Sequence, residues 1–184
     1  MGTAKTRKKR LRYTVFKTGW GYFGLAGTED ALCRICLPGP QHDRIKGQLL
    51  ATLGYARYDK DLLRSLQEQI VAYFEGTHVS FESDIPVLLE GFSHFAVSVL
   101  GACRQIRFGQ VITYSELGKK IGRPSAARAV GNVLARNPLP LIIPCHRVIR
   151  TDGQIGGFSA PGGKDLKARL LRHEHAWPIG RRST

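Results

Sequence analysis

The sequence has no long apolar run, although 42% of its 184 residues are hydrophobic. A helix that crosses a bilayer needs about 20 consecutive, mostly apolar residues, so we expect no membrane segment. The first residues are basic and lack the apolar core of a secretory leader. We therefore expect a globular, intracellular protein.

Acidic residues are scarce, with 14 Asp and Glu against 28 Lys and Arg, which gives a net charge of +14. Such an excess favours a polyanionic partner, and nucleic acid is the first candidate. The alternative is a basic but merely solvated surface. Basic residues crowd the start of the chain, and we interpret residues 1–12 as a flexible basic arm that helps hold DNA, or as a solvated tail.

Cysteine is also scarce, with four residues: Cys33, Cys36, Cys103 and Cys145. In a reducing compartment we expect free thiols rather than disulfides. The spacing of Cys33 and Cys36 suits a structural zinc site, but no second pair accompanies it, and packing on a strand explains both. We therefore expect no cofactor, and Cys103 should be a small core residue.

Periodicity divides the chain into two parts. In the first, short β-rich runs at 13–16, 20–26 and 32–37 precede a helical pattern over 59–75. In the second, apolar residues at helical spacing predict helices over 92–106 and 164–174. We predict an α+β fold, with a small N-terminal α/β domain over 13–88 and a mostly helical C-terminal domain over 89–184.

Between those helices the sequence predicts a helix-turn-helix. Thr113 and Glu116 match a capping box that begins a helix over 114–120, and Gly122-Arg123 is the turn. A second helix opens at Pro124 or Ser125 and closes at Asn137-Pro138.

The second helix has two different faces. Its inner face carries small apolar residues: Ala126, Ala129, Val130 and Val133. Its outer face carries polar and basic residues at a spacing of four: Arg128, Asn132 and Arg136. This arrangement is typical of DNA-binding helix pairs, although an ordinary helical hairpin with a solvated basic face has the same pattern.

Cys145 and His146 follow an apolar run at 140–143, which predicts a buried strand that ends at a thiol. Imidazole and guanidinium groups beside a cysteine favour the reactive thiolate. Neighbouring residues on a regular strand point to opposite faces. The pair can therefore act together only if the backbone turns here or if a water molecule bridges the two groups.

Five segments, in order along the chain, resemble the O6-alkylguanine-DNA alkyltransferases, also called methylated-DNA–protein-cysteine methyltransferases. They are Phe108-Gly109-Gln110-Val111-Ile112-Thr113-Tyr114, Ala126-Ala127-Arg128-Ala129-Val130-Gly131, Asn137-Pro138-Leu139-Pro140, Pro144-Cys145-His146-Arg147-Val148 and Leu170-Leu171-Arg172-His173-Glu174. The resemblance implies that the N-terminal domain is RNase H-like. It also implies direct-reversal DNA repair, in which the alkyl group of O6-alkylguanine, and of O4-methylthymine, moves irreversibly to the protein.

The resemblance gives five residues a catalytic role. Cys145 would accept the alkyl group, His146 would take its proton through a water molecule, and Glu174 would orient His146. Asn137 would brace the turn before the active-site strand. Tyr114 would rotate the target nucleotide and donate a hydrogen bond to the purine.

The resemblance also implies contacts to DNA and to the flipped base. Arg128 would enter the base stack. The expected DNA-binding residues are Arg128, Tyr114, Ser115, Ala127, Asn132 and Arg136. The expected substrate-binding residues are Val148, Ser159, Phe158 and Pro140. Phe158 stands where the family often has tyrosine, and the loop after it is slightly longer than usual.

The expected partner is double-stranded DNA with alkylated bases, bound by a monomer in the cytoplasm of a prokaryote or in a nucleus. Two alternatives are a non-catalytic protein that binds lesions and a helix-turn-helix regulator. The first is disfavoured because such relatives replace the acceptor cysteine, whereas Cys145 is present. A cysteine hydrolase is a third alternative, but the sequence gives no independent sign of an oxyanion hole.

Overall fold

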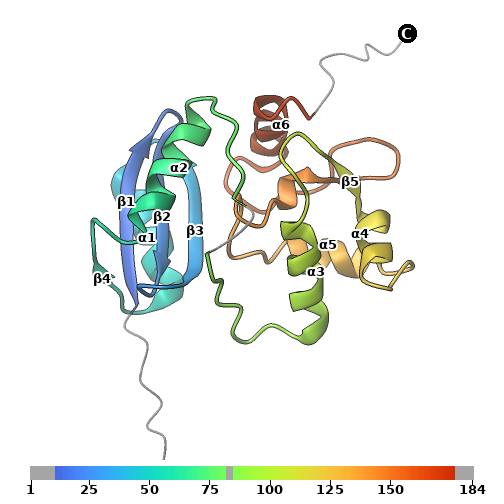
Figure 1. The fold of residues 1–184 in the computed structure, drawn as a ribbon, viewed down its shortest axis with the longest axis horizontal. Helices are drawn as coiled ribbons and strands as arrows, with labels where there is room; N and C mark the ends of the chain where they lie inside the picture. Colours follow the sequence, from blue (N-terminus) through green and yellow to red (C-terminus); the bar gives the residue numbers. More distant parts are fainter. Residues whose placement is uncertain (1–10, 82–84, 177–184) are drawn as a thin grey trace, which may run out of the picture.

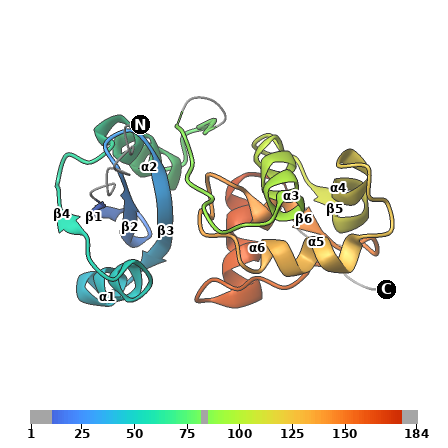
Figure 2. The same ribbon diagram turned by 90° about the horizontal axis from the view of Figure 1, so that it is seen from below.

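The computed structural model describes residues 11–81 and 85–176. In this part of the chain a sheet with its helices and a mostly helical half lie side by side (Figures 1 and 2). The α+β class predicted from the sequence is confirmed. Across the described ranges, every helix is too short or too polar to cross a membrane.

The sheet has the strand order β3-β2-β1-β4. Its strands are β1 (Arg12–Thr18), β2 (Gly21–Gly27), β3 (Leu32–Gly39) and β4 (Arg57–Tyr58). The first three correspond to the predicted β-rich runs and form an antiparallel meander, and β4 runs parallel to β1. Gly21 has φ of 121°, and a Cβ atom there would lie 2.5 Å from the carbonyl oxygen of Gly39. The hairpin therefore requires glycine at this position.

Two helices, α1 (His42–Leu53) and α2 (Arg64–Phe74), cover opposite faces of the sheet (Figure 2). The helix predicted from residue 59 begins only at Arg64, because the chain first makes a turn and Leu63 adopts a left-handed conformation with φ of 50°. Helix α1 was not predicted. Ile45, Leu49 and Leu53 recur at a spacing of four, so a helical signal was present in the sequence, and the structure buries Ile45 and Leu49.

The basic arm predicted over residues 1–12 falls almost wholly outside the described residues, which begin at Leu11. Arg12 is part of the sheet instead of the arm, since it is the first residue of β1. Its Nη1 lies 2.9 Å from Oδ2 of Asp59, and its Nη2 contacts Glu29.

The helical half contains four helices, two short strands and one 3-10 turn among the described residues. Its elements are α3 (His94–Arg104), β5 (Ile112–Thr113), α4 (Tyr114–Lys120), α5 (Ala127–Leu134), the 3-10 turn η1 (Cys145–Arg147), β6 (Val148–Ile149) and α6 (Gly163–His173). The capping box is confirmed: Oγ1 of Thr113 accepts the Glu116 N–H at 3.1 Å, and Oε2 of Glu116 accepts the Thr113 N–H at 2.6 Å. Helices α4 and α5 pack as the predicted helix-turn-helix pair.

The two halves share one hydrophobic core. It runs from Phe23 in β2 through Val99 and Cys103 in α3 to Leu170 in α6, and Cys103 is fully buried, as predicted. A backbone hydrogen bond of 2.9 Å from the N–H of Ile35 to the carbonyl of Pro138 also links β3 to the chain that leads to the active-site turn.

Candidate active site

A two-stranded parallel pairing brings the predicted site together. Strand β5 pairs with β6 in the register Ile112 to Val148 and Thr113 to Ile149. Tyr114 directly follows β5, and the η1 turn directly precedes β6. Tyr114 and the turn that carries Cys145 therefore lie at opposite ends of this short pairing, and both line the same pocket.

The predicted strand over 140–143 is wrong, because the chain turns repeatedly between Leu139 and Cys145. Leu141 has φ of 82°, and the N–H of Ile143 donates to the carbonyl of Leu139 at 2.8 Å. Pro140 and Pro144 lack the N–H groups that a strand ladder needs. Cys145 and His146 then lie in a 3-10 turn, so they are not forced to opposite faces as on a strand.

Asn137 holds this turn from within. Its Nδ2 donates to the carbonyl of Ile143 at 2.8 Å and lies 3.1 Å from Sγ of Cys145. Its Oδ1 accepts the N–H of Leu139 at 3.0 Å. One side chain therefore fixes both the backbone of the turn and the thiol.

A fully buried ionic network lies behind the thiol. Nε2 of His146 is 2.8 Å from Oε1 of Glu174, and Nε of Arg147 donates to Oε2 at 2.8 Å. A second bond of 3.0 Å joins Nη2 of Arg147 to Oε1. The sequence analysis expected a nearby guanidinium to favour the thiolate, but it did not predict that Arg147 binds Glu174.

The network sets the proton positions. Burial alone would raise the pKa of Glu174, but the charges and hydrogen bonds of His146 and Arg147 outweigh it and hold that pKa far below its usual range. Burial lowers the pKa of His146, and this effect outweighs the charge and hydrogen bond of Glu174, which raise it. A neutral His146 facing this carboxylate carries its proton on Nε2. Nδ1 is then free to accept a proton, and it has no hydrogen-bond partner among the described residues.

Lys167 is a functional candidate that the sequence reasoning missed. It is fully buried, and its Nζ donates to the carbonyl of Val148 at 2.6 Å. Burial lowers its pKa to about 8. Burial also raises the pKa of Cys145, while the Asn137 amide and the charge of Lys167 oppose that effect. The signal was present, because Lys167 precedes Leu170 and Leu171 by three and four residues and so shares their buried stripe.

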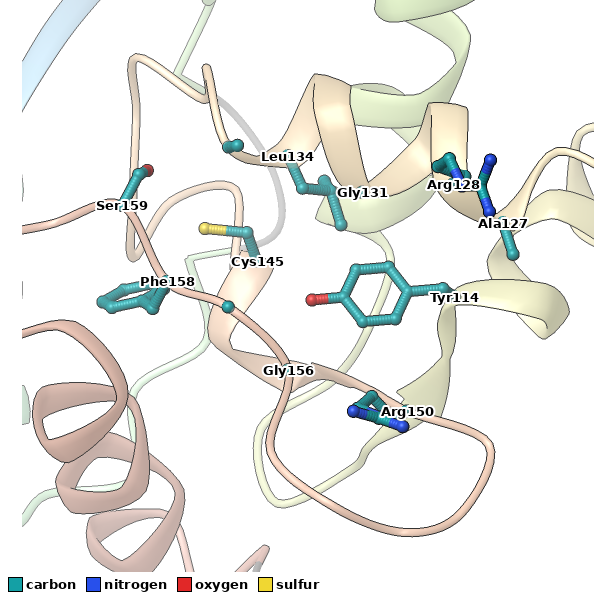
Figure 3. A pocket seen from close by; sticks show the side chains of 12 residues that line it. Tyr114, Ala127, Arg128, Gly131, Leu134, Cys145, Arg150, Gly156, Phe158 and Ser159 are labelled. Carbon is teal, nitrogen blue, oxygen red and sulfur yellow. The ribbon is translucent and has the colours of Figure 1, made fainter.

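Cys145 lines a pocket of about 500 Å³ (Figure 3). The predicted residues Tyr114, Ala127, Arg128, Phe158 and Ser159 line it too. The ring of Tyr114 lies across the pocket with its hydroxyl directed toward the Cys145 side, and Arg128 lies at the opposite end (Figure 3). Lining residues that the sequence did not indicate are Gly131, Leu134, Ala135, Arg150, Gly156 and Gly157.

Gly156 allows Tyr114 to occupy this position. A Cβ atom on Gly156 would lie 2.5 Å from the Tyr114 hydroxyl oxygen and 2.8 Å from Cε2 of its ring. Burial raises the pKa of Tyr114, so its hydroxyl stays protonated and can donate.

A second cavity of about 600 Å³ reaches Cys145 from the sheet half. Predicted residues that line it are Arg136, Asn137, Pro140, Phe158 and Ser159. Strand β3 supplies the opposite wall with Arg34, Ile35, Cys36 and Leu37. The thiol therefore faces a pocket on the helix-turn-helix side and a cavity between the halves.

The outer face of α5 is exposed and basic, as the spacing predicts. Arg128, Asn132 and Arg136 are exposed, and Nε of Arg136 donates to the carbonyl of Asn132 at 3.3 Å. The predicted inner face needs one correction, because Ala129 is exposed, whereas Val130 and Val133 are buried. Ser115 is half-buried on α4 and does not line either cavity.

Cys33 and Cys36 pack against the smaller apolar cluster between α1 and the sheet. Burial raises the pKa of Cys33, and it raises the pKa of Cys36 to about 11. Across residues 11–81 and 85–176, no three His, Cys, Asp or Glu side chains are grouped as metal ligands.

The chain is similar to known proteins along most of its length. Residues 11–89 match the family described as "6-O-methylguanine DNA methyltransferase, ribonuclease-like domain", and residues 94–176 match the corresponding "DNA binding domain". The methylated-DNA–protein-cysteine methyltransferase of Methanosarcina acetivorans is 34% identical over 89% of this chain and 98% of its own length. The protein of that name from Cricetulus griseus is 34% identical over 90% and 82%.

Solved structures agree with these matches. The O6-methylguanine methyltransferase of Mycobacterium tuberculosis has a TM-score of 0.73 at 29% identity, with 92% of this chain and 96% of the other covered. The M. tuberculosis structure in complex with DNA has a TM-score of 0.73 at 31% identity, with coverage of 91% and 95%.

Proposed function

The chain belongs to the methylated-DNA–protein-cysteine methyltransferase family, and from that premise we propose that it repairs DNA by moving the methyl group of O6-methylguanine onto its own Cys145. DNA is its partner. The observation that supports Cys145 as the acceptor is its placement. The thiol lies against the Asn137 amide in a pocket wall, with the His146–Glu174 network behind it.

The transfer begins with loss of the thiol proton. It passes through a water molecule to Nδ1 of His146, the buried acceptor that has no other partner among the described residues. Glu174 stabilises the resulting imidazolium, and the Lys167 charge and the Asn137 amide stabilise the thiolate.

The thiolate then attacks the methyl carbon in line. The Sγ–C bond forms as the C–O6 bond breaks, and the bonding electron pair stays on the guanine. The Tyr114 hydroxyl donates a hydrogen bond to the purine as this charge develops, and the proton held by His146 finally neutralises the guanine. The product thioether has no hydrolytic route back to a thiol, so one molecule acts once.

Access to the methyl group requires the nucleotide to leave the duplex. A base inside the stack cannot reach a thiol in a pocket wall, and flipping costs a few kcal/mol. Arg128 at the exposed end of the pocket fills the vacated stack and offsets part of this cost. Ser115, Ala127, Asn132 and Arg136 contact the DNA backbone around it.

The flipped base is held in the pocket by the surrounding backbone and side chains. The carbonyls of Cys145 and Val148 receive its exocyclic amine, and Val148 has a second lone pair besides the one that Lys167 uses. Ser159 lies near O6, with Phe158 and Pro140 as walls. The cavity between the halves gives room for alkyl groups larger than methyl. On the family resemblance, O4-methylthymine is a further substrate of this proposal. One chain supplies every group used, so we propose a monomer.

The test is stoichiometry. Duplex DNA with radiolabelled methyl on O6 of one guanine should pass label to the protein up to one equivalent, after which transfer stops. Cys145→Ala should keep DNA binding and lose transfer, and Cys33→Ala, at a residue that lines neither cavity, should behave as the wild type. Wild-type binding to the lesion with no transfer would support the non-catalytic alternative instead.

A further inference from the structure

Tyr73, the penultimate residue of α2 in the sheet half, touches the reactive network directly. Its side chain is fully buried, and its hydroxyl donates to Oε1 of Glu174 at 2.7 Å across 101 positions of sequence. Its backbone carbonyl lies 2.5 Å from Nε2 of His173. Two adjacent residues at the end of α6 are therefore tied to one tyrosine of the other half.

The oxygen that Tyr73 contacts is the one that holds His146. Oε1 of Glu174 accepts from Tyr73, from His146 at 2.8 Å and from Nη2 of Arg147 at 3.0 Å, whereas the one described donor to Oε2 is Nε of Arg147 at 2.8 Å. Each donated hydrogen bond stabilises the negative charge on this oxygen and so weakens its attraction for the other donors. Hydrogen bonds to an ion in a low-dielectric site are strong. The Tyr73 hydroxyl thus competes with His146 for the charge of Glu174.

The ring of Tyr73 is locked in place. Its centroid lies 5.0 Å from those of Phe74 and His173 and 5.6 Å from that of Phe81, with Phe108 at 6.1 Å. Burial and the neighbouring carboxylate raise the pKa of Tyr73 far above its usual value, so the hydroxyl stays a donor. The hydrogen bond from Tyr73 to Glu174 is therefore held in place by packing at the interface between the halves.

We propose that Tyr73 is a positioning residue for the alkyl transfer, through which the sheet half orients Glu174 and limits the basicity of His146. This inference rests on the proposed function. The charged and titratable groups that surround His146 are Glu174 and Lys167 of the α6 region, Arg147 of η1, and Cys145 itself. Tyr73 is the group from the sheet half that contacts this set through Glu174.

The direction of the effect follows from the competition. Without the hydroxyl, Oε1 of Glu174 carries more charge for His146 and favours its protonated form. An imidazolium cannot accept the thiol proton. Loss of the Tyr73 hydroxyl should therefore slow transfer most at mildly acidic pH and least at alkaline pH.

The experiment compares Tyr73→Phe with Tyr13→Phe, which removes the hydroxyl of another buried tyrosine of the sheet half, on β1. Transfer rates from pH 6 to 9 and the His146 titration by NMR are measured for both. In Tyr73→Phe the pKa of His146 should rise by about one unit, with about a tenfold rate loss below that pKa and unchanged DNA affinity. Tyr13→Phe should match the wild type.

A folded Tyr73→Phe protein with a wild-type rate profile and an unchanged His146 titration would overturn the inference. If that variant does not fold, a fluorotyrosine at position 73 keeps the hydroxyl and makes it a stronger donor. The pKa of His146 should then fall, and no change would overturn the inference. If the wild type transfers no methyl group, the proposed function fails, while the His146 titration still decides the link to Tyr73.

Discussion

At the scale of the residue, the position and the proton of the Cys145 thiol are controlled by different neighbours. Asn137 fixes the turn and contacts the thiol, and His146 presents a free acceptor because Glu174 holds its other nitrogen. The family resemblance predicted these four residues from three separate segments of the chain. It could not show the contact of Tyr73, since a hydrogen bond across 101 residues leaves no local pattern, and Lys167 was missed although it shares the buried stripe of α6.

The charge of Glu174 should also stabilise the fold. Its pKa is far below the unfolded value of about 4.3, so its contribution is present above that pH and is lost as pH falls below it. Glu174→Gln should lower the free energy of unfolding by roughly 3 kcal/mol at pH 7, because it leaves Arg147 buried without its ionic partner. Urea unfolding at pH 7, 5 and 3 should show this difference shrinking toward acid.

The control is Glu68→Gln, which breaks an exposed pair with Arg64 on α2. An exposed pair contributes little, so this variant should unfold as the wild type at every pH. An equal penalty for Glu174→Gln at pH 3 and pH 7 would contradict the stabilising role of its charge.

At the scale of the element, the site depends on how α4, α5 and the loop over 151–162 approach one another. The capping box that starts α4 was predicted and is confirmed, and it sets the direction from which Tyr114 enters the pocket. The strand predicted before Cys145 was wrong. The apolar run there has a strand's hydrophobicity, but its two prolines and the left-handed Leu141 make it a turn. The loop has no periodicity, so its contact with Tyr114 could not be foreseen.

That contact gives a test with a matched control. Gly156→Ala should displace Tyr114, because the new Cβ atom would lie 2.5 Å from its hydroxyl oxygen. A misplacement of this kind can cost roughly a hundredfold in rate, measured as methyl transfer from duplex DNA. Gly101→Ala adds the same atom on α3, outside the pocket, where nothing lies within 4 Å, and it should be nearly silent. Equal rates for the two variants would show that the position of Tyr114 does not limit transfer.

Helix α5 gives the second test at this scale. Arg128→Ala should slow repair in duplex DNA much more than reaction with free O6-methylguanine, since only the duplex has a stack to fill. Rates on both substrates measure the effect. Arg57→Ala, which removes an equal charge from the exposed β4 strand, should change neither rate by much. Equal losses of Arg128→Ala on both substrates would contradict the stack-filling role.

At the scale of the whole molecule, two halves of different architecture share a core and a site. Composition and charge indicated a globular, DNA-binding chain, and motifs in register identified the family, which the comparisons confirm. No function for the first half was predicted from its residues. The structure gives it two contacts with the site: strand β3 forms one wall of the cavity beside Cys145, and Tyr73 reaches Glu174. Such contacts arise from packing between halves, which periodicity within one element does not encode.

The central claim is that Cys145 itself accepts the alkyl group. The most direct test is peptide mass spectrometry after reaction of the wild type with duplex DNA that contains O6-methylguanine. The peptide with Cys145 should gain the mass of one CH₂ group in step with loss of the lesion, and the peptides with Cys33, Cys36 and Cys103 should be unchanged. Repair of the lesion with no added mass on the Cys145 peptide would contradict the account.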